Sequence, residues 1–344
     1  MINVDTRKHV GWKVGLSVSA PNDGDPDWPP DWGDKTRAIN RFVYDEANNF
    51  LFEGAQLILG HSWKDSLGRW DEDGVLSHLA RDARLFRRLK PEAPDPVTGT
   101  VPPAILNFLA WPDQPPPRSE VVAQRLINQD LLQILQILPI GIEKELPDQD
   151  LYPDSIKTFL LTDLGRFARI RALTTMRRML VRHTEYRFFV GGPVRDVKAQ
   201  PSDSVDANRL PGIVEEAILT QEAGQPLYIS SAFGGAAKAI ADTLLQRKLK
   251  IPADCAFYTA PRIAEIMTRF SGKYPSSGDI EGSSLSGGWN AHDYFRSLDL
   301  DILARNAGLE TDSYIQMLAS PILDVAMSWM LTGVKALRSK SKRD

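Results

Sequence analysis

The chain has 344 residues, of which 42% are hydrophobic and 25% charged, a composition typical of globular proteins. Its formal net charge of −3 gives no overall electrostatic attraction for nucleic acid. The single cysteine, Cys255, excludes an internal disulfide and a cysteine-based zinc cluster. The histidines are scattered without the spacing of metal ligands, so we expect no metal site and assign no cofactor.

Hydropathy and charge also bear on the cellular location. No apolar run approaches the roughly 20 residues that a membrane-spanning helix needs. Residues 1–14 are polar and charged, unlike a secretory signal, and a lone cysteine suits a reducing compartment. We therefore expect a cytoplasmic protein without membrane partners. It would consist of one domain over 1–335 and a disordered basic tail over 336–344.

Short apolar segments alternate with segments of helical periodicity along the chain. The expected strands are 12–19, 55–59, 104–110, 186–190 and 226–230. The expected helices are 35–53, 74–89, 120–138, 163–183, 212–223 and 236–247, followed by a mostly helical remainder. This alternation predicts an α/β fold with a Rossmann-like, doubly wound, mainly parallel sheet, helices on both faces and extra C-terminal helices.

Polar and glycine-rich turns follow four of the expected strands. In parallel sheets, ligands bind at the carboxyl ends of strands, near the point where the strand order reverses. The ligand-binding candidates around these turns are Gly15, Ser17, Ser19, Gly60, His61, Gly191, Gly192, Ser231, Gly234 and Gly235. Ordinary turn chemistry remains an alternative for each of them. The loop 28–32 (WPPDW) is a candidate lid or a rigid surface loop.

The run from Arg166 to Glu216 combines an arginine-rich helix, a strand ending in two glycines, and a helix that opens with acids. Glycine lets a backbone approach a phosphate closely, and a helix N-terminus offers free N–H donors to it. An arginine adds planar, bidentate recognition of an anion. The segment therefore predicts a nucleotide or sugar-phosphate pocket. Its candidates are Arg177, Arg178, Gly212, Glu215 and Glu216.

Each of these side chains also has a structural interpretation. The arginines could form a solvated helix face with salt bridges. The acids could simply complement the macrodipole in the first helical turn. The choice between Glu215 and Glu216 as the residue that faces the pocket stays open.

The segment 175–179 (TMRRM), placed before a strand that ends in Gly-Gly, resembles the LOG fold, the lysine-decarboxylase-like phosphoribohydrolases. The signature of that family is Met-x-x-Arg-Lys, a strand, and Pro-Gly-Gly-x-Gly-Thr-x-x-Glu. Here the glycine motif is split into 191–193 (GGP) and 211–216 (PGIVEE), with an insertion between them. The split motif and 230–237 (SSAFGGAA) are more similar to the wider SLOG superfamily of SMF/DprA–LOG-related domains. The stretch 306–333 is similar as well.

The resemblance implies a role for particular residues and a kind of ligand. Arg177 matches the catalytic arginine of the LOG family, Arg178 matches the lysine, and Glu216 matches the acid, with Glu215 as its rival by one position. SLOG domains bind nucleotides or nucleotide-derived signals, and they often occur in bacterial anti-phage systems. Related domains commonly form homo-oligomers.

Two functions follow from these expectations. The first is binding and sensing of a nucleotide-derived small molecule that acts through a separate effector protein, because an insertion replaces the turn that places the family's acid. The alternative is a LOG-like hydrolase or transferase acting on an N-glycosidic bond, in which Arg177 holds phosphate and Glu216 assists the chemistry at C1′. A DNA-processing role is disfavoured by the acidic net charge, so nucleic acid is not an expected partner.

Overall fold

The computed structural model describes residues 11–19, 35–64, 69–89, 100–147, 153–193, 210–249, 261–274 and 291–341. The candidate lid at 28–32, most of the insertion after Pro193, and Cys255 lie outside the described residues.

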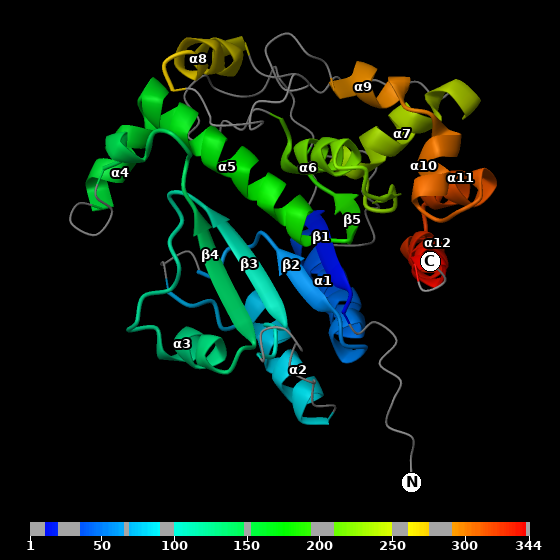
Figure 1. Cartoon of the computed structure of the whole chain (residues 1–344), viewed down its shortest axis with the longest axis horizontal. Coiled ribbons are helices and arrows are strands. Elements are labelled where there is room, and N and C mark those ends of the chain that lie inside the picture. The colour runs from blue at the N-terminus through cyan, green and yellow to red at the C-terminus, as the bar shows by residue number, and fades with distance from the viewer. Residues whose placement is uncertain are drawn as a thin grey trace.

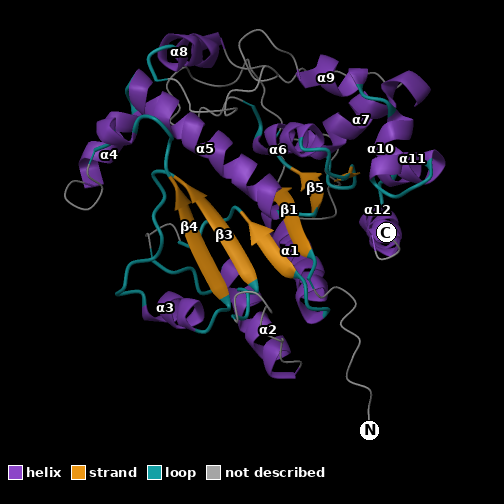
Figure 2. Ribbon diagram, in the orientation of Figure 1, coloured by secondary structure: helices purple, strands orange, loops and turns teal. Residues whose placement is uncertain are grey.

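Within the described part of the chain, six parallel strands form one sheet in the order β4-β3-β2-β1-β5-β6 (Figure 2). The strands are β1 Lys13–Ser19, β2 Gln56–Leu59, β3 Ile105–Ala110, β4 Leu132–Ile137, β5 Tyr186–Gly191 and β6 Leu227–Ser230. The predicted α/β class with a Rossmann-like parallel sheet is confirmed.

The helices surround this sheet (Figure 1). They are α1 Lys35–Phe52, α2 Val75–Leu89, α3 Val121–Asn128, α4 Pro153–Leu160, α5 Asp163–His183, α6 Gly212–Glu222, α7 Gly235–Leu249, α8 Pro261–Ser271, α9 Ala291–Ser297, α10 Leu300–Asn306, α11 Thr311–Ala319 and α12 Leu323–Ser341, with a short 3-10 turn at Glu143–Glu145.

Two apolar cores hold the layers together. In the larger core, β1 residues such as Val14 and Leu16 pack with α1, α2 and α7. In the smaller core, Ile58 and Phe108 pack against Ala172 and Met176 of α5, which crosses the sheet from β4 to β5. Helices α5 and α6 pack against each other. Because alternate strand residues face opposite sides of a sheet, Gly15 and Ser17 of β1 face away from the core that holds Val14 and Leu16.

The C-terminal helices close the sheet edge at β6. The Tyr228 hydroxyl donates a hydrogen bond to the Ala307 carbonyl (2.9 Å), and the Tyr314 hydroxyl donates to the Leu227 carbonyl (2.8 Å). The expected extra C-terminal helices are therefore present. Helix α12 continues to Ser341, through the first residues of the segment expected to be a basic tail.

The prediction of one helix over 120–138 is wrong. Helix α3 ends at Asn128, and Asp130 has a φ of 54°, which turns the chain into β4. Asp tolerates this left-handed conformation better than most residues. The apolar spacing of 131–138 suits a helix or a strand. The free edge of β3 decides between them, because it pairs with β4 from Ile105↔Leu132 to Ala110↔Ile137.

Candidate functional site

The strand order reverses between β1 and β5. The connection after β1 leads to β2 on one side, whereas β5 returns on the other side of β1 after α5 has crossed the sheet. At this switch point Ser19 pairs with Gly191, and the Gly192 N–H donates to the Ser19 carbonyl (2.7 Å). In open parallel sheets, ligands usually bind at such a switch point.

Two glycine turns meet beside the switch point. Four glycines have left-handed backbone: Gly191 (φ 67°), Gly192 (φ 89°), Gly234 (φ 65°) and Gly235 (φ 63°). A Cβ added to Gly191 would lie 2.5 Å from the Ser19 carbonyl oxygen. The Ala236 N–H donates to the Gly192 carbonyl (2.9 Å), so the turns after β5 and β6 are joined through their backbones.

A buried ion pair holds α5 to α6 below these turns. Arg177 of α5 forms a hydrogen-bonded ion pair with Glu215 in the first turn of α6. The Thr174 hydroxyl donates to the other oxygen of the same carboxylate (2.5 Å). The Glu215 side chain is 0% exposed, so both of its oxygens are used inside the protein. This acid therefore holds the two helices together rather than facing solvent.

Glu216 lies in a second part of the same network. Nη1 of Arg187 donates to the Glu216 carboxylate (2.8 Å) and to the Ser17 hydroxyl oxygen (2.7 Å), and Ser17 donates to Glu216 in turn. Nε of Arg177 lies 3.9 Å from the other Glu216 oxygen. The Glu216 side chain is 13% exposed, against 0% for Glu215, so Glu216 is the acid that reaches solvent.

The charges of this network balance, since Arg177 and Arg187 face two carboxylates. Burial lowers the pKa of Arg187, while the charge and the hydrogen bond of Glu216 raise it. Pairing with hydrogen bonds is what makes buried charges tolerable.

Two glycines among the predicted ligand contacts make room for these arginines. A Cβ on Gly15 would lie 3.0 Å from Cζ of Arg187, and a Cβ on Gly212 would lie 3.0 Å from Nη2 of Arg177. Arg187 was not among the predicted site residues. Its signal in the sequence is a charged residue inside an otherwise apolar strand (YRFFV), which requires a buried partner.

The remaining predicted residues lie around this centre. Gly60 packs near Leu180 of α5, and the backbone of His61 is held by both ends of the Asn107 amide (2.9 Å each). The Ser231 hydroxyl donates to the Ser320 carbonyl (3.0 Å), which ties β6 to the segment before α12. Within the described residues, neither His61 nor Ser231 bonds to the network of Arg177 and Glu216. Arg178 is half-buried on α5.

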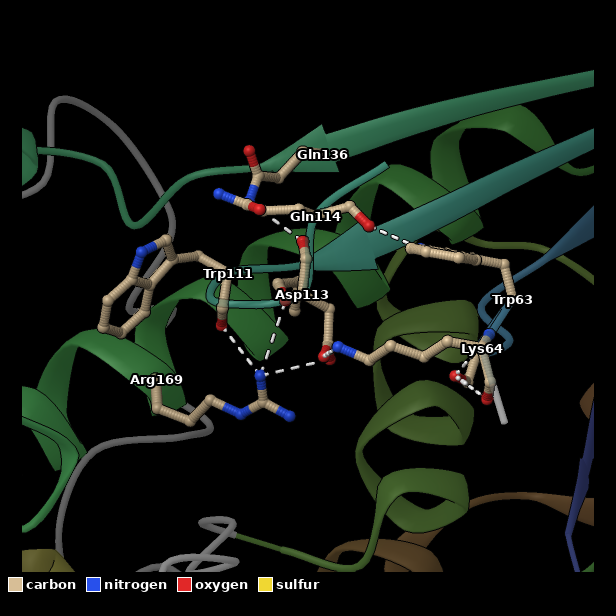
Figure 3. A network of polar contacts seen from close by, with 9 residues as sticks. Trp63, Lys64, Trp111, Asp113, Gln114, Gln136 and Arg169 are labelled. Atoms are coloured by element: carbon tan, nitrogen blue, oxygen red, sulfur yellow. Dashed lines mark hydrogen bonds and ion pairs between the residues drawn. The ribbon is translucent and has the colours of Figure 1, made fainter. Parts of the chain in front are cut away.

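A second polar cluster lies beyond the ends of β2 and β3 (Figure 3). Lys64 Nζ is 3.2 Å from Oδ1 of Asp113, and Nη1 of Arg169 is 3.4 Å from Oδ2 of the same carboxylate. The Gln136 amide donates to the Asp113 carbonyl (2.9 Å), and the Trp63 indole donates to the Gln114 carbonyl. No sequence motif marks these residues, because four separate parts of the chain bring them together: the segments after β2 and β3, strand β4 and helix α5.

Neither a metal site nor a membrane span is found in the ranges that the structure describes. No group of three or more His, Cys, Asp or Glu side chains there is placed to hold a metal ion. No helix in those ranges combines the length and the apolar character needed to cross a bilayer.

The sheet order and the buried network define a Rossmann-like α/β protein whose candidate site lies at the switch point of the sheet. A family model described as SLOG cluster2 matches residues 10–273, so the chain belongs to this family. The resemblance to the SLOG superfamily is thereby confirmed, and the family suggests a nucleotide-related function. Helices α9 to α12 lie outside the matched range. Comparisons with curated proteins and with solved structures gave no match.

Proposed function

We propose that this protein binds a nucleotide or a nucleotide-derived small molecule at the joined glycine turns after β5 and β6, and that it senses this ligand. The observation that carries the proposal is the backbone hydrogen bond from Ala236 to Gly192, which unites both turns beside the switch point. Successive backbone N–H groups in left-handed turns form concave sites for phosphate, and Gly235 opens helix α7 at the same place.

The network of Arg177 and Glu216 favours binding over turnover. A general base must be within reach of the proton it removes, with an oxygen available to accept it. One oxygen of Glu216 already accepts hydrogen bonds from Ser17 and Arg187, and Arg177 is held by Glu215. We infer that these side chains position α6 and the glycine turns, while the exposed edge of Glu216 contacts a ribose hydroxyl.

The sensing step would be a population shift. The ligand would prefer one arrangement of the loops or of a homo-oligomer and so favour it over the others. A separate effector protein would then respond. A cytoplasmic role in bacterial anti-phage defence is the setting that the family resemblance supports.

A thermal-shift panel tests the proposal. Nucleoside monophosphates, cyclic nucleotides and ADP-ribose would each be added to the purified protein. A ligand at a hundredfold excess over its Kd adds about 2.7 kcal/mol of stability. At about 2.1 cal/mol/K per residue, this raises the Tm of a chain of 344 residues by about 4 °C.

Two glycine variants locate the bound ligand. Gly192→Ala should abolish the ligand-induced shift, because its Cβ would lie 2.5 Å from Cδ1 of Ile213 and 3.3 Å from Cβ of Ala236 and would displace the joined turns. Gly224→Ala is the matched control: its φ of 68° imposes the same left-handed strain, but no atom lies within 4 Å of the added Cβ. The proposal fails when no member of the panel stabilises the wild type, or when both variants keep the shift.

A hydrolase or transferase acting on an N-glycosidic bond is the second candidate. It is favoured by the partial exposure of Glu216 next to Arg177. Incubation with nucleoside monophosphates and NAD, followed by chromatography, tests it. If the wild type releases a free base and Glu216→Gln does not, the protein is an enzyme and the sensing proposal is wrong.

A further inference from the structure

We propose that Lys64 and Arg169 form a second anion subsite, so that the ligand carries two separated anionic groups, as a dinucleotide with a terminal phosphate does. This inference rests on the proposed function, because it extends the same binding edge.

The cluster contains more positive than negative charge. Two cations, Lys64 and Arg169, flank the single carboxylate of Asp113 at 3.2 Å and 3.4 Å. The side chains are 38% (Lys64), 38% (Asp113) and 25% (Arg169) exposed, so a ligand can reach them. Asp113 offsets one of the two positive charges, so the cluster keeps an excess of one positive charge that can attract a phosphate beside the carboxylate.

Arg169 has N–H groups that could donate hydrogen bonds to a ligand. Its hydrogen bonds in the described part of the chain all pass through Nη1, to the carbonyls of Ala110 (3.5 Å) and Trp111 (3.0 Å) and to Asp113 (Figure 3). The other edge of the guanidinium fork makes no hydrogen bond to the described residues. One nitrogen thus fixes the side chain to the loop after β3, and the remaining edge presents planar N–H donors to an anion.

The cluster shares an edge of the sheet with the glycine turns. Lys64 follows the carboxyl end of β2, and Asp113 follows that of β3. Strands are about 4.8 Å apart, so β2 and β3 lie about 10 and 14 Å from β5. Arg169 lies eight residues before Arg177 on α5, which is about 12 Å along the helix axis. A nucleoside monophosphate has one phosphate, so filling both places takes a longer ligand.

The charge of Lys64 can be removed without removing the support of its loop. The Lys64 backbone pairs with Trp70 in an isolated antiparallel bridge, and the Ser62 hydroxyl contacts the Lys64 N–H (3.3 Å). The Trp63 indole holds the neighbouring loop through Gln114. Lys64→Gln should therefore leave the unliganded Tm unchanged.

Isothermal titration calorimetry compares the four ribonucleoside 5′-monophosphates with the matching 5′-phosphorylated homodinucleotides. We expect wild type to bind one dinucleotide at least tenfold more tightly than its monophosphate, because a hydrogen bond to a charged group contributes about 1.5–3 kcal/mol. Lys64→Gln should weaken the dinucleotide about tenfold and leave the monophosphate unchanged. Lys13→Gln, which removes the same charge at the amino end of β1, should change neither.

The outcomes separate the two proposals. Monophosphate binding without a dinucleotide advantage, or a dinucleotide affinity unaffected by Lys64→Gln, overturns the second subsite and leaves the glycine-turn site in place. A lower unliganded Tm in Lys64→Gln, with the affinity ratio unchanged, shows a structural brace and also overturns it. No binding of any dinucleotide to wild type overturns the second subsite, and no binding of any compound in this series or in the thermal-shift panel refutes both proposals.

Discussion

Replacing Arg187 by methionine should destabilise the protein by about 3 kcal/mol. The Arg187 side chain is 1% exposed, and its loss removes the 2.8 Å ion pair to Glu216. Breaking a buried pair by deleting one partner costs about 3–5 kcal/mol. The lower end applies here because Glu216 keeps the Ser17 hydroxyl, lies 3.9 Å from Arg177 and is 13% exposed.

Urea and thermal unfolding would measure this cost. At about 2.1 cal/mol/K per residue, 3 kcal/mol lowers the Tm of a chain of 344 residues by about 4 °C. The control, Arg41→Met, breaks an exposed pair to Asp45 whose side chains are 85% and 58% exposed. It should cost no more than about 0.5 kcal/mol.

A double-mutant cycle tests the reasoning directly. Arg187→Met combined with Glu216→Leu should cost less than the sum of the two single changes, because neither charge is then buried without its partner. Additive costs would refute the ion-pair account, and so would an Arg187→Met that loses no more stability than Arg41→Met.

Three further predictions concern other parts of the fold. Asp130→Val should lower the free energy of unfolding, measured in urea, by about 1–2 kcal/mol, because Asp130 has a left-handed φ of 54° that a β-branched residue adopts poorly. Asp130→Gly should cause no such loss, and equal losses in the two variants would contradict this. Gly165→Ala should lower the free energy of unfolding by about 3 kcal/mol, because the added Cβ would collide with the Phe159 carbonyl oxygen. Gly272→Ala is the control and should be neutral, since no atom lies within 4 Å of its added Cβ. Burial raises the pKa of Glu46 in the folded protein, so ionisation costs stability above pH about 4.5. Glu46→Gln should therefore raise the Tm at pH 7 and not at pH 4; an equal effect at both would contradict the shift.

The buried network shows which part of the site was open to sequence reasoning. Arg177, Glu215 and Glu216 could be proposed from their motif and from a helix start at Gly212. Motif spacing alone did not separate the two acids, because neighbouring positions on a helix differ only in the direction that their side chains take. The packing of α6 on α5 separates them, with Glu215 fully enclosed and Glu216 partly exposed.

The prediction of one helix over 120–138 was wrong for a similar reason, because a local pattern could not choose between two structures. Apolar residues over 131–138 satisfy the period of a helix and also that of a half-buried strand. The local pattern contains no information about whether a neighbouring strand has an unpaired edge. In the fold, β3 offers that edge, and β4 takes it.

The alternation of apolar strands with amphipathic helices was enough by itself to determine the α/β class and the boundaries of α5, because burial periodicity is a local property. The family resemblance came from short motifs, above all 175–179, 191–193, 211–216 and 230–237, which are local as well. Only the tertiary structure placed Arg187 over Gly15, enclosed Glu215, and brought Lys64, Asp113 and Arg169 together from three elements. These contacts join residues far apart in the chain, and their geometry depends on sheet order and helix packing, which no local pattern encodes.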